Sequence, residues 1–208
     1  MAFVDGDDLL PWVKGYLEQG QLPRHLEHEN KQIRLSKLTS SLLDTVSKPV
    51  VSANAYLGAR AITKGLELGA DIIICGRVAD ASLVIGAAWW WHSWSETDYN
   101  ELAGAFVAGH LIECSAYVTG ANFAGFTDYD LESLIDVGFP IAEIERDGTC
   151  VITKHLDTKG IVNVDTVTCQ FLYELQGDAY LNSDVKAILH DVQIEQVGLS
   201  RYIKTLPR

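Results

Sequence analysis

Residues 70–94 read ADIIICGRVADASLVIGAAWWWHSW, and this stretch decides the fold class. The apolar run at 72–75 is short and β-branched, which is typical of a strand buried on both faces of a parallel sheet. A helical pattern over 54–69 precedes the run, and a second helix is expected over 81–92, with Asp80 as its N-cap. Helix, buried strand and helix in this order predict a parallel α/β layer.

The second half of the chain has a different pattern. Residues 140–154, PIAEIERDGTCVITK, are two alternating runs around an Asp-Gly pair, which predicts a β-hairpin. Residues 165–175 favour a helix capped by Asp165, and residues 184–198 alternate as one or two strands. The predicted fold class is therefore α/β, with a parallel α/β layer in the first half and antiparallel hairpins in the second half.

These patterns divide the chain into two regions. We expect an α/β core over 1–137 and a mixed β-hairpin and helix region over 138–208, packed on that core or continuous with it. Near the N-terminus, Asp7 and Asp8 suit the start of a helix, because carboxylates there meet free N–H groups. A weak strand is expected at 33–35.

The composition limits the classes of partner. The 208 residues are 48% hydrophobic and 21% charged, an ordinary globular composition with enough length for a sizeable core. The 28 acidic and 16 basic residues leave a net charge of -12, which repels phosphate backbones and anionic lipid. We expect no nucleic acid and no membrane as partners. With no signal peptide and no apolar run long enough to span a bilayer, we expect a cytoplasmic protein.

The sequence offers no metal or cofactor motif. Its four cysteines form no CxxC pair and match no zinc spacing, so we expect four buried, reduced thiols and no metal: Cys75, Cys114, Cys150 and Cys169. The glycine-rich nucleotide motifs, the GxSxG elbow and the HExxH pair are also missing from the sequence, so no cofactor is evident.

Arg77 follows the apolar run at the carboxyl end of the expected strand, where ligands of open α/β sheets bind. Its guanidinium can hold a carboxylate or phosphate through two parallel hydrogen bonds, and the alternative is an ion pair with Asp80. Asp80 can also orient Arg77, and Ser82 can donate to an anion from the first turn of the expected helix. Arg77, Asp80 and Ser82 are candidate substrate-binding residues.

His110 and Glu113 lie three residues apart on a helix expected over 98–114, so they share one face. The pair suits acid–base catalysis, with the glutamate orienting the imidazole. A metal site would need further ligands that are not spaced to match, and a structural hydrogen bond in a packed helix is the remaining alternative. We take His110 and Glu113 as candidate catalytic residues.

Three further residues complete the candidate substrate-binding set. Asn54 begins a helical pattern and either contacts a ligand or caps the helix. Asn122, in the TGANF loop, either contacts a ligand or forms an Asx-turn. Lys154 ends a hairpin strand, where it either holds a carboxylate or phosphate or is solvated.

The four clustered tryptophans cannot share one helix face, because consecutive residues lie about 100° apart. Some must therefore face a partner, a cleft or another subunit: Trp89, Trp90, Trp91 and Trp94. An exposed aromatic patch favours packing between subunits over the lining of an acyl pocket.

Several long motifs occur in order along the chain. They are VDGDDLLP at 4–11, the segment from ANAYLGARAI to WWWHSW at 53–94, LAGAFVAGHLIECSAYVTGANF at 102–123, GFPIAEIERDGTCVITKH at 138–155 and TVTCQFLYEL at 166–175. Together they resemble the acyclic terpene utilisation family of AtuA-type proteins. The resemblance implies a small-molecule substrate related to branched terpenoid acids such as citronellic and geranic acid, either as the acyl compound itself or as its CoA thioester.

The chain departs from the family pattern at two places. Members of the family usually carry a segment before the VDGDDLLP motif, and this chain begins almost at that motif. We therefore expect a homo-oligomer or a partner chain that supplies the segment. The loop at 156–160 is usually glycine-rich in the family and reads LDTKG here.

Two classes of function follow from the sequence. The first is an enzyme that acts on a branched terpenoid-like acyl or acyl-CoA substrate by acid–base chemistry of the hydratase or lyase type. The second is a non-catalytic or truncated paralogue that serves as a subunit or a ligand-binding protein. A specialised-metabolite biosynthesis enzyme that reuses the scaffold is a further alternative.

Overall fold

The computed structural model describes residues 1–20, 49–175, 177–190, 192–198 and 201–202. The strand expected at 33–35 lies outside the described residues. In chain order the helices and strands are β1 (Ala2–Val4), α1 (Leu10–Glu18), α3 (Arg60–Glu67), β2 (Ile73–Cys75), α4 (Ser82–His92), α5 (Tyr99–Ile112), β3 (Pro140–Ile144), β4 (Cys150–Lys154), α6 (Val164–Leu172), β5 (Ala179–Leu181), β6 (Lys186–Ile188), β7 (Gln196–Gly198) and β8 (Arg201–Tyr202). Three short 3-10 helices lie between α5 and β3: η1 (Ser115–Tyr117), η2 (Phe126–Asp128) and η3 (Leu131–Leu134).

The first half forms the predicted parallel layer. Strands β1 and β2 pair in parallel, with Phe3 opposite Ile74, and α3 packs on one face of the pair. The packing is close, because a Cβ at Gly65 of α3 would come within 2.8 Å of the Ile73 side chain. The prediction that β2 is buried on both faces is wrong: Phe3 is 72% exposed and Ile74 50% exposed, since no element among the described residues covers their face.

The second half forms the predicted antiparallel hairpins. Strands β3 and β4 pair from Pro140 opposite Lys154 to Ile144 opposite Cys150, and the sheet order is β3-β4-β8-β7. Strands β5 and β6 form a separate antiparallel pair. The fold class is therefore mixed α/β, with a parallel pair early in the chain and antiparallel hairpins later.

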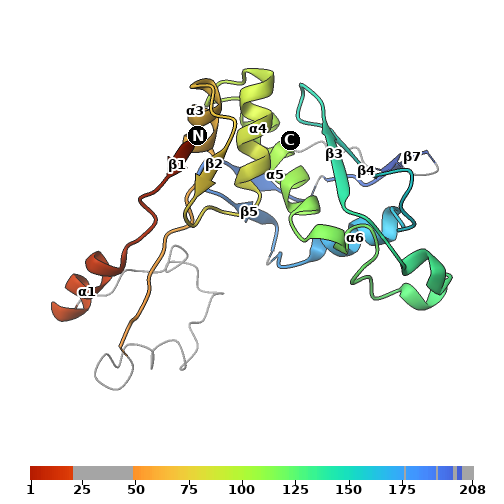
Figure 1. Cartoon of the computed structure of the whole chain (residues 1–208), viewed down its shortest axis with the longest axis horizontal. Helices are drawn as coiled ribbons and strands as arrows, with labels where there is room; N and C mark the ends of the chain where they lie inside the picture. The colour runs from red at the N-terminus through yellow and green to blue at the C-terminus, as the bar shows by residue number, and fades with distance from the viewer. Residues whose placement is uncertain (21–48, 176, 191, 199–200, 203–208) are drawn as a thin grey trace.

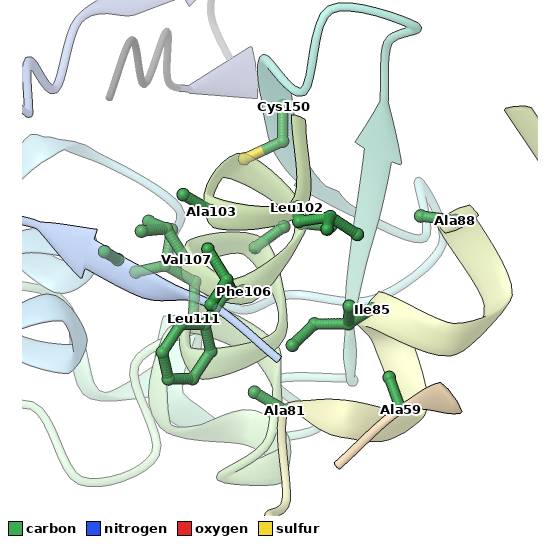
Figure 2. Packing of buried hydrophobic residues seen from close by; sticks show 14 of the residues in the cluster. Ala59, Ala81, Ile85, Ala88, Leu102, Ala103, Phe106, Val107, Leu111 and Cys150 are labelled. Carbon is green, nitrogen blue, oxygen red and sulfur yellow. The ribbon is translucent and has the colours of Figure 1, made fainter. Parts of the chain in front are cut away.

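Helix α5 is the centre of the core. It was expected over 98–114, and all ten residues from 102 to 111 are buried. Figure 2 shows Phe106 and Leu111 of this helix, with Ile85 of α4 and Cys150 of β4 in the same cluster. The cluster also contains residues of α6 and β6, so one hydrophobic core joins both halves of the chain.

Glycines allow the central helix to approach its neighbours. A Cβ at Gly104 would clash with the carbonyl of Gly148, which lies in the β3–β4 turn with φ +82°. A Cβ at Gly109 would lie 2.8 Å from the Ala81 side chain, at the start of α4. These two contacts bring the hairpin turn and the start of α4 against α5, as Figure 1 shows for the elements themselves.

Three predicted helix starts are wrong. Helix α3 begins at Arg60, so Asn54 caps no helix and lies in an extended segment that bridges to Asp8. The N-cap of α4 is Ala81, without a side-chain cap, in place of Asp80. Helix α6 is capped by Asn163, not by Asp165, and the cap is a reciprocal capping box with Thr166.

Two other expectations have partial outcomes. None of the four cysteines is in a disulfide, but only Cys150 is buried, and the other three are partly exposed. In the described part of the chain, no helix is long and apolar enough to cross a membrane.

Candidate functional site

Asp7 organises the edge at which both parallel strands end. Its Oδ2 accepts hydrogen bonds from the Asn54 side-chain amide at 2.8 Å and from the Arg77 backbone N–H at 2.9 Å. The Arg77 N–H and then the Asn54 amide lower the pKa of the Asp7 carboxyl. Gly76 leaves room for the Asp7 carboxylate, because a Cβ there would displace it from this position. The edge therefore holds the Arg77 backbone and the Asn54 side chain in fixed positions.

The Arg77 guanidinium lies at this edge and is half exposed. Its Cζ is 5.4 Å from the centre of the Tyr56 ring, within the range of a cation–π contact. Its Nη1 is 4.0 Å from Asp80 Oδ1, and the two side chains are 51% and 67% exposed. An ion pair this long and this exposed is weak, so the guanidinium retains donors for an anion.

Ser82 lies behind the edge rather than on it. The side chain is fully buried, and its Oγ accepts a hydrogen bond from the Asn182 amide at 3.0 Å. Asp184 follows Asn182 by two residues. Its carboxylate accepts a hydrogen bond from the Ala59 backbone N–H at 2.5 Å and lies 3.6 Å from Arg60 Nε. The loop at 182–184 thus joins the starts of α3 and α4.

The predicted His110–Glu113 contact is formed. His110 Nδ1 lies 3.1 Å from Glu113 Oε1, and Nε2 lies 3.1 Å from the Phe171 carbonyl oxygen. A carbonyl oxygen only accepts, so Nε2 carries a proton, and a further proton is shared between Nδ1 and the carboxyl. The imidazole is only 1% exposed, and both ring nitrogens are engaged by protein groups.

Within the described residues, two buried acceptor atoms at this pair meet no hydrogen-bond donor: Glu113 Oε2 and Gln170 Oε1. Gln170 is fully buried, and its amide nitrogen donates to the His110 carbonyl at 2.8 Å. Sequence reasoning missed Gln170, because a glutamine within a helix has no distinguishing pattern.

Tyr180 is a second residue that sequence reasoning missed. Its ring stacks on Phe106 at 4.3 Å and meets the His110 ring edge-on at 5.0 Å. Burial first, and then the negative charges of Glu113, Glu174 and Asp80, raise the pKa of Tyr180 to about 12. Gly109, next to His110 in α5, packs directly against Ala81, next to Asp80, so the arginine edge and the buried His110–Glu113 pair are neighbours.

Asn122 and Lys154 lie at the far end of the molecule, around the segments 119–139 and 155–161. Asn122 lines an open hollow of about 420 Å³ with neighbouring aromatic residues. Lys154 Nζ donates to the carbonyl of Thr158 at 2.5 Å, so its ammonium closes the turn after β4. The structure thus brings together Asn54, Arg77 and Asp80, places His110 and Glu113 behind them, and leaves Asn122 and Lys154 elsewhere. The roles of these residues stay predictions.

The described residues contain no group of three or more His, Cys, Asp and Glu side chains that could hold a metal ion. The arrangement instead provides a half-exposed arginine, a half-buried phenol and a buried His–Glu pair. Its chemical capacities are therefore anion binding and proton transfer.

Helices, a parallel strand pair and antiparallel hairpins define a mixed α/β protein whose strand ends form a polar edge. The family model described as acyclic terpene utilisation family protein AtuA matches residues 1–203. The chain therefore belongs to the acyclic terpene utilisation family. No curated protein and no solved structure matches it.

Proposed function

We propose that the chain is an enzyme that acts on a branched terpenoid-like acyl or acyl-CoA substrate by acid–base chemistry of the hydratase or lyase type. The observation that carries the proposal is the half-exposed Arg77 at the carboxyl ends of β1 and β2. A carboxylate, or a phosphate of CoA, would take two parallel hydrogen bonds from this guanidinium. Family membership supports the branched acyl class of substrate.

The acid–base roles belong to the groups beside this edge. The His110–Glu113 pair would hold the proton that the reaction exchanges, and the His110 ring packs edge-on against Tyr180. With a pKa of about 12, the Tyr180 phenol stays protonated at neutral pH and would donate a hydrogen bond to a substrate carbonyl. Asn54 and Asp80 would contact the polar head of the substrate, with Asp7 holding Asn54 in place.

The second candidate is a non-catalytic subunit or ligand-binding protein. It is favoured by one observation: His110 is 1% exposed, with both ring nitrogens engaged by Glu113 and Phe171. A general base must reach the proton that it abstracts. In this alternative the Arg77 edge binds the same anion, and no turnover follows.

The experiment that tests the proposal is native mass spectrometry with citronelloyl-CoA, geranoyl-CoA and the two free acids, with octanoyl-CoA as the unbranched comparison. We expect retention of a branched ligand, and at least about a tenfold loss of retention in Arg77→Gln. Arg146→Gln is the matched control, because Arg146 is also an exposed arginine and lies in the β3–β4 turn. Absence of binding by the wild type, or equal loss in both variants, contradicts the proposal.

Deuterium exchange separates the enzyme from the binding protein. The retained ligand is incubated with the protein in D₂O, and its mass is followed with time. Incorporation of deuterium that is lost in Tyr180→Phe supports acid–base chemistry at the proposed groups. Binding without incorporation contradicts the enzyme proposal and supports the ligand-binding alternative.

A further inference from the structure

Helix α4 is apolar on every side, although only one side faces the core. Ile85, Ala88 and Trp89 are buried in the main cluster. The outer side carries an apolar stripe at positions i, i+4, i+7 and i+8: Leu83, Ala87, Trp90 and Trp91. Leu83 is 54% exposed and Trp91 is 73% exposed. A helix that is hydrophobic on all sides is normally buried on all sides, so we expect another surface to pack on the outer side of α4.

The stripe is one wall of a groove of about 470 Å³. Leu66 of α3 and Ala142 and Ile144 of β3 line the same groove, and we call these residues together with the stripe the tryptophan groove. Its apolar walls suit side chains rather than water.

A small ligand is a poor fit for the tryptophan groove. Binding sites for small molecules carry a few convergent polar groups that fix the ligand's orientation. Among the residues that line this groove, His92 is the one polar side chain, and its Nε2 lies 3.1 Å from the Ile144 carbonyl oxygen. The His92 ring also stacks on Trp94 at 5.1 Å, so the imidazole is held by the protein itself.

Charge does not oppose a second copy of the chain at this place. The net charge is -12, so two copies repel each other over much of their surface. Residues 81–91 contain no charged side chain, and the stripe therefore meets its own copy without like-charge contact. A twofold axis pairs each patch with itself, so the protruding Trp91 of one copy enters the hollow of the other, and the reverse.

We propose that the tryptophan groove is closed by the tryptophan groove of a second copy, with α4 packed on α4 across a twofold axis. Large aromatic side chains bury roughly 150 to 250 Å² each when fully covered, and with Trp90 40% and Trp91 73% exposed the patch offers on the order of 400 Å² per copy. Two such patches come to roughly 800 Å², a size that suits a weak monomer–dimer equilibrium.

Sedimentation velocity of the full chain over a range of concentrations tests the proposal. We expect a monomer–dimer equilibrium whose dissociation constant rises at least about 30-fold in Trp91→Ala, as for a central interface tryptophan. Trp12→Ala is the matched control, because Trp12 of α1 is 50% exposed and does not line the groove. Leu83→Glu, which brings two like charges together across the axis, abolishes the dimer.

Near-ultraviolet circular dichroism checks that each variant keeps its fold. We expect the fold to be kept in Trp91→Ala, because the Trp91 side chain is exposed. A wild type that is monomeric at all concentrations overturns the proposal. For such a monomer, a titration with decanoate that quenches the tryptophan fluorescence would identify the groove as a ligand site instead. A dimer that Trp91→Ala and Leu83→Glu leave unchanged overturns it as well. A dimer weakened by these two variants and unaffected by Trp12→Ala supports it.

Discussion

The Asp184 carboxylate caps helix α3 at Ala59, 125 residues away in sequence, through a hydrogen bond of 2.5 Å. The Asp184 side chain is 3% exposed, and Arg60 Nε lies 3.6 Å from its other oxygen. A carboxylate at a helix N-terminus satisfies a free N–H group and interacts with the positive end of the helix dipole. Gly58 permits the approach, because any Cβ there would clash with Asp184.

Replacing Asp184 removes this cap. We expect Asp184→Ala to lower the free energy of unfolding by about 2 kcal/mol, because a buried, charge-assisted hydrogen bond is lost and the Ala59 N–H is left without a partner. Urea denaturation measures the change. Asp178→Ala is the control at an exposed aspartate at the opposite end of β5, and it should change stability little. Equal losses in the two variants would contradict the capping role.

The Asp7 bonds to Asn54 and Arg77 give stability a dependence on acid pH. Their effect lowers the Asp7 pKa from 3.8 in the folded state, so the contribution is present above that value and is lost as the pH falls through the lower, folded pKa. We expect the difference in stability between the wild type and Asp7→Asn to be constant from pH 5 to 7 and to shrink below about pH 4. Denaturation series at each pH measure it, and a difference that grows in acid would exclude this assignment.

Local patterns in the sequence predicted the elements that local chemistry determines. The run at 72–75 predicted β2 and its parallel pairing, and the Asp147-Gly148 pair predicted the β3–β4 hairpin. The spacing of His110 and Glu113 also predicted their contact. In each case the information lies within a few neighbouring residues.

Contacts between distant segments carry no such local signal. Asp80 has the side chain of an N-cap, yet α4 begins at Ser82 without a side-chain cap, and the Ser82 hydroxyl accepts a hydrogen bond from Asn182, 100 residues away. The position of Tyr180 against His110 depends on how the β5–β6 hairpin packs on α5. These placements follow from the tertiary fold, which the periodicity of a single segment does not encode.

The stability of the protein should depend on His110 and Glu113 being present together, because each of these buried side chains satisfies the other. We expect His110→Leu to lower the free energy of unfolding by about 3 to 5 kcal/mol, because Glu113 then retains a carboxylate with no partner on either oxygen. The double variant His110→Leu with Glu113→Leu should regain part of this loss, because no uncompensated charge remains. Chemical denaturation of both single variants and the double variant gives the coupling energy, and strictly additive losses would argue against a coupled pair.

The raised pKa of Tyr180 makes stability fall in alkaline solution. In the unfolded chain a tyrosine ionises near pH 10, whereas the folded protein holds Tyr180 protonated up to about 12. The contribution of Tyr180 to the free energy of unfolding is therefore fully present below pH 10 and is lost as the pH rises through the folded pKa, because ionisation stabilises the unfolded state first.

We expect Tyr180→Phe to lose less stability than the wild type between pH 10 and 12, and its ultraviolet titration to lack the component with a midpoint near 12. Tyr99→Phe, at an exposed tyrosine, is the control and should retain that component. If the component persists in Tyr180→Phe, the protonated phenol proposed beside His110 is not Tyr180.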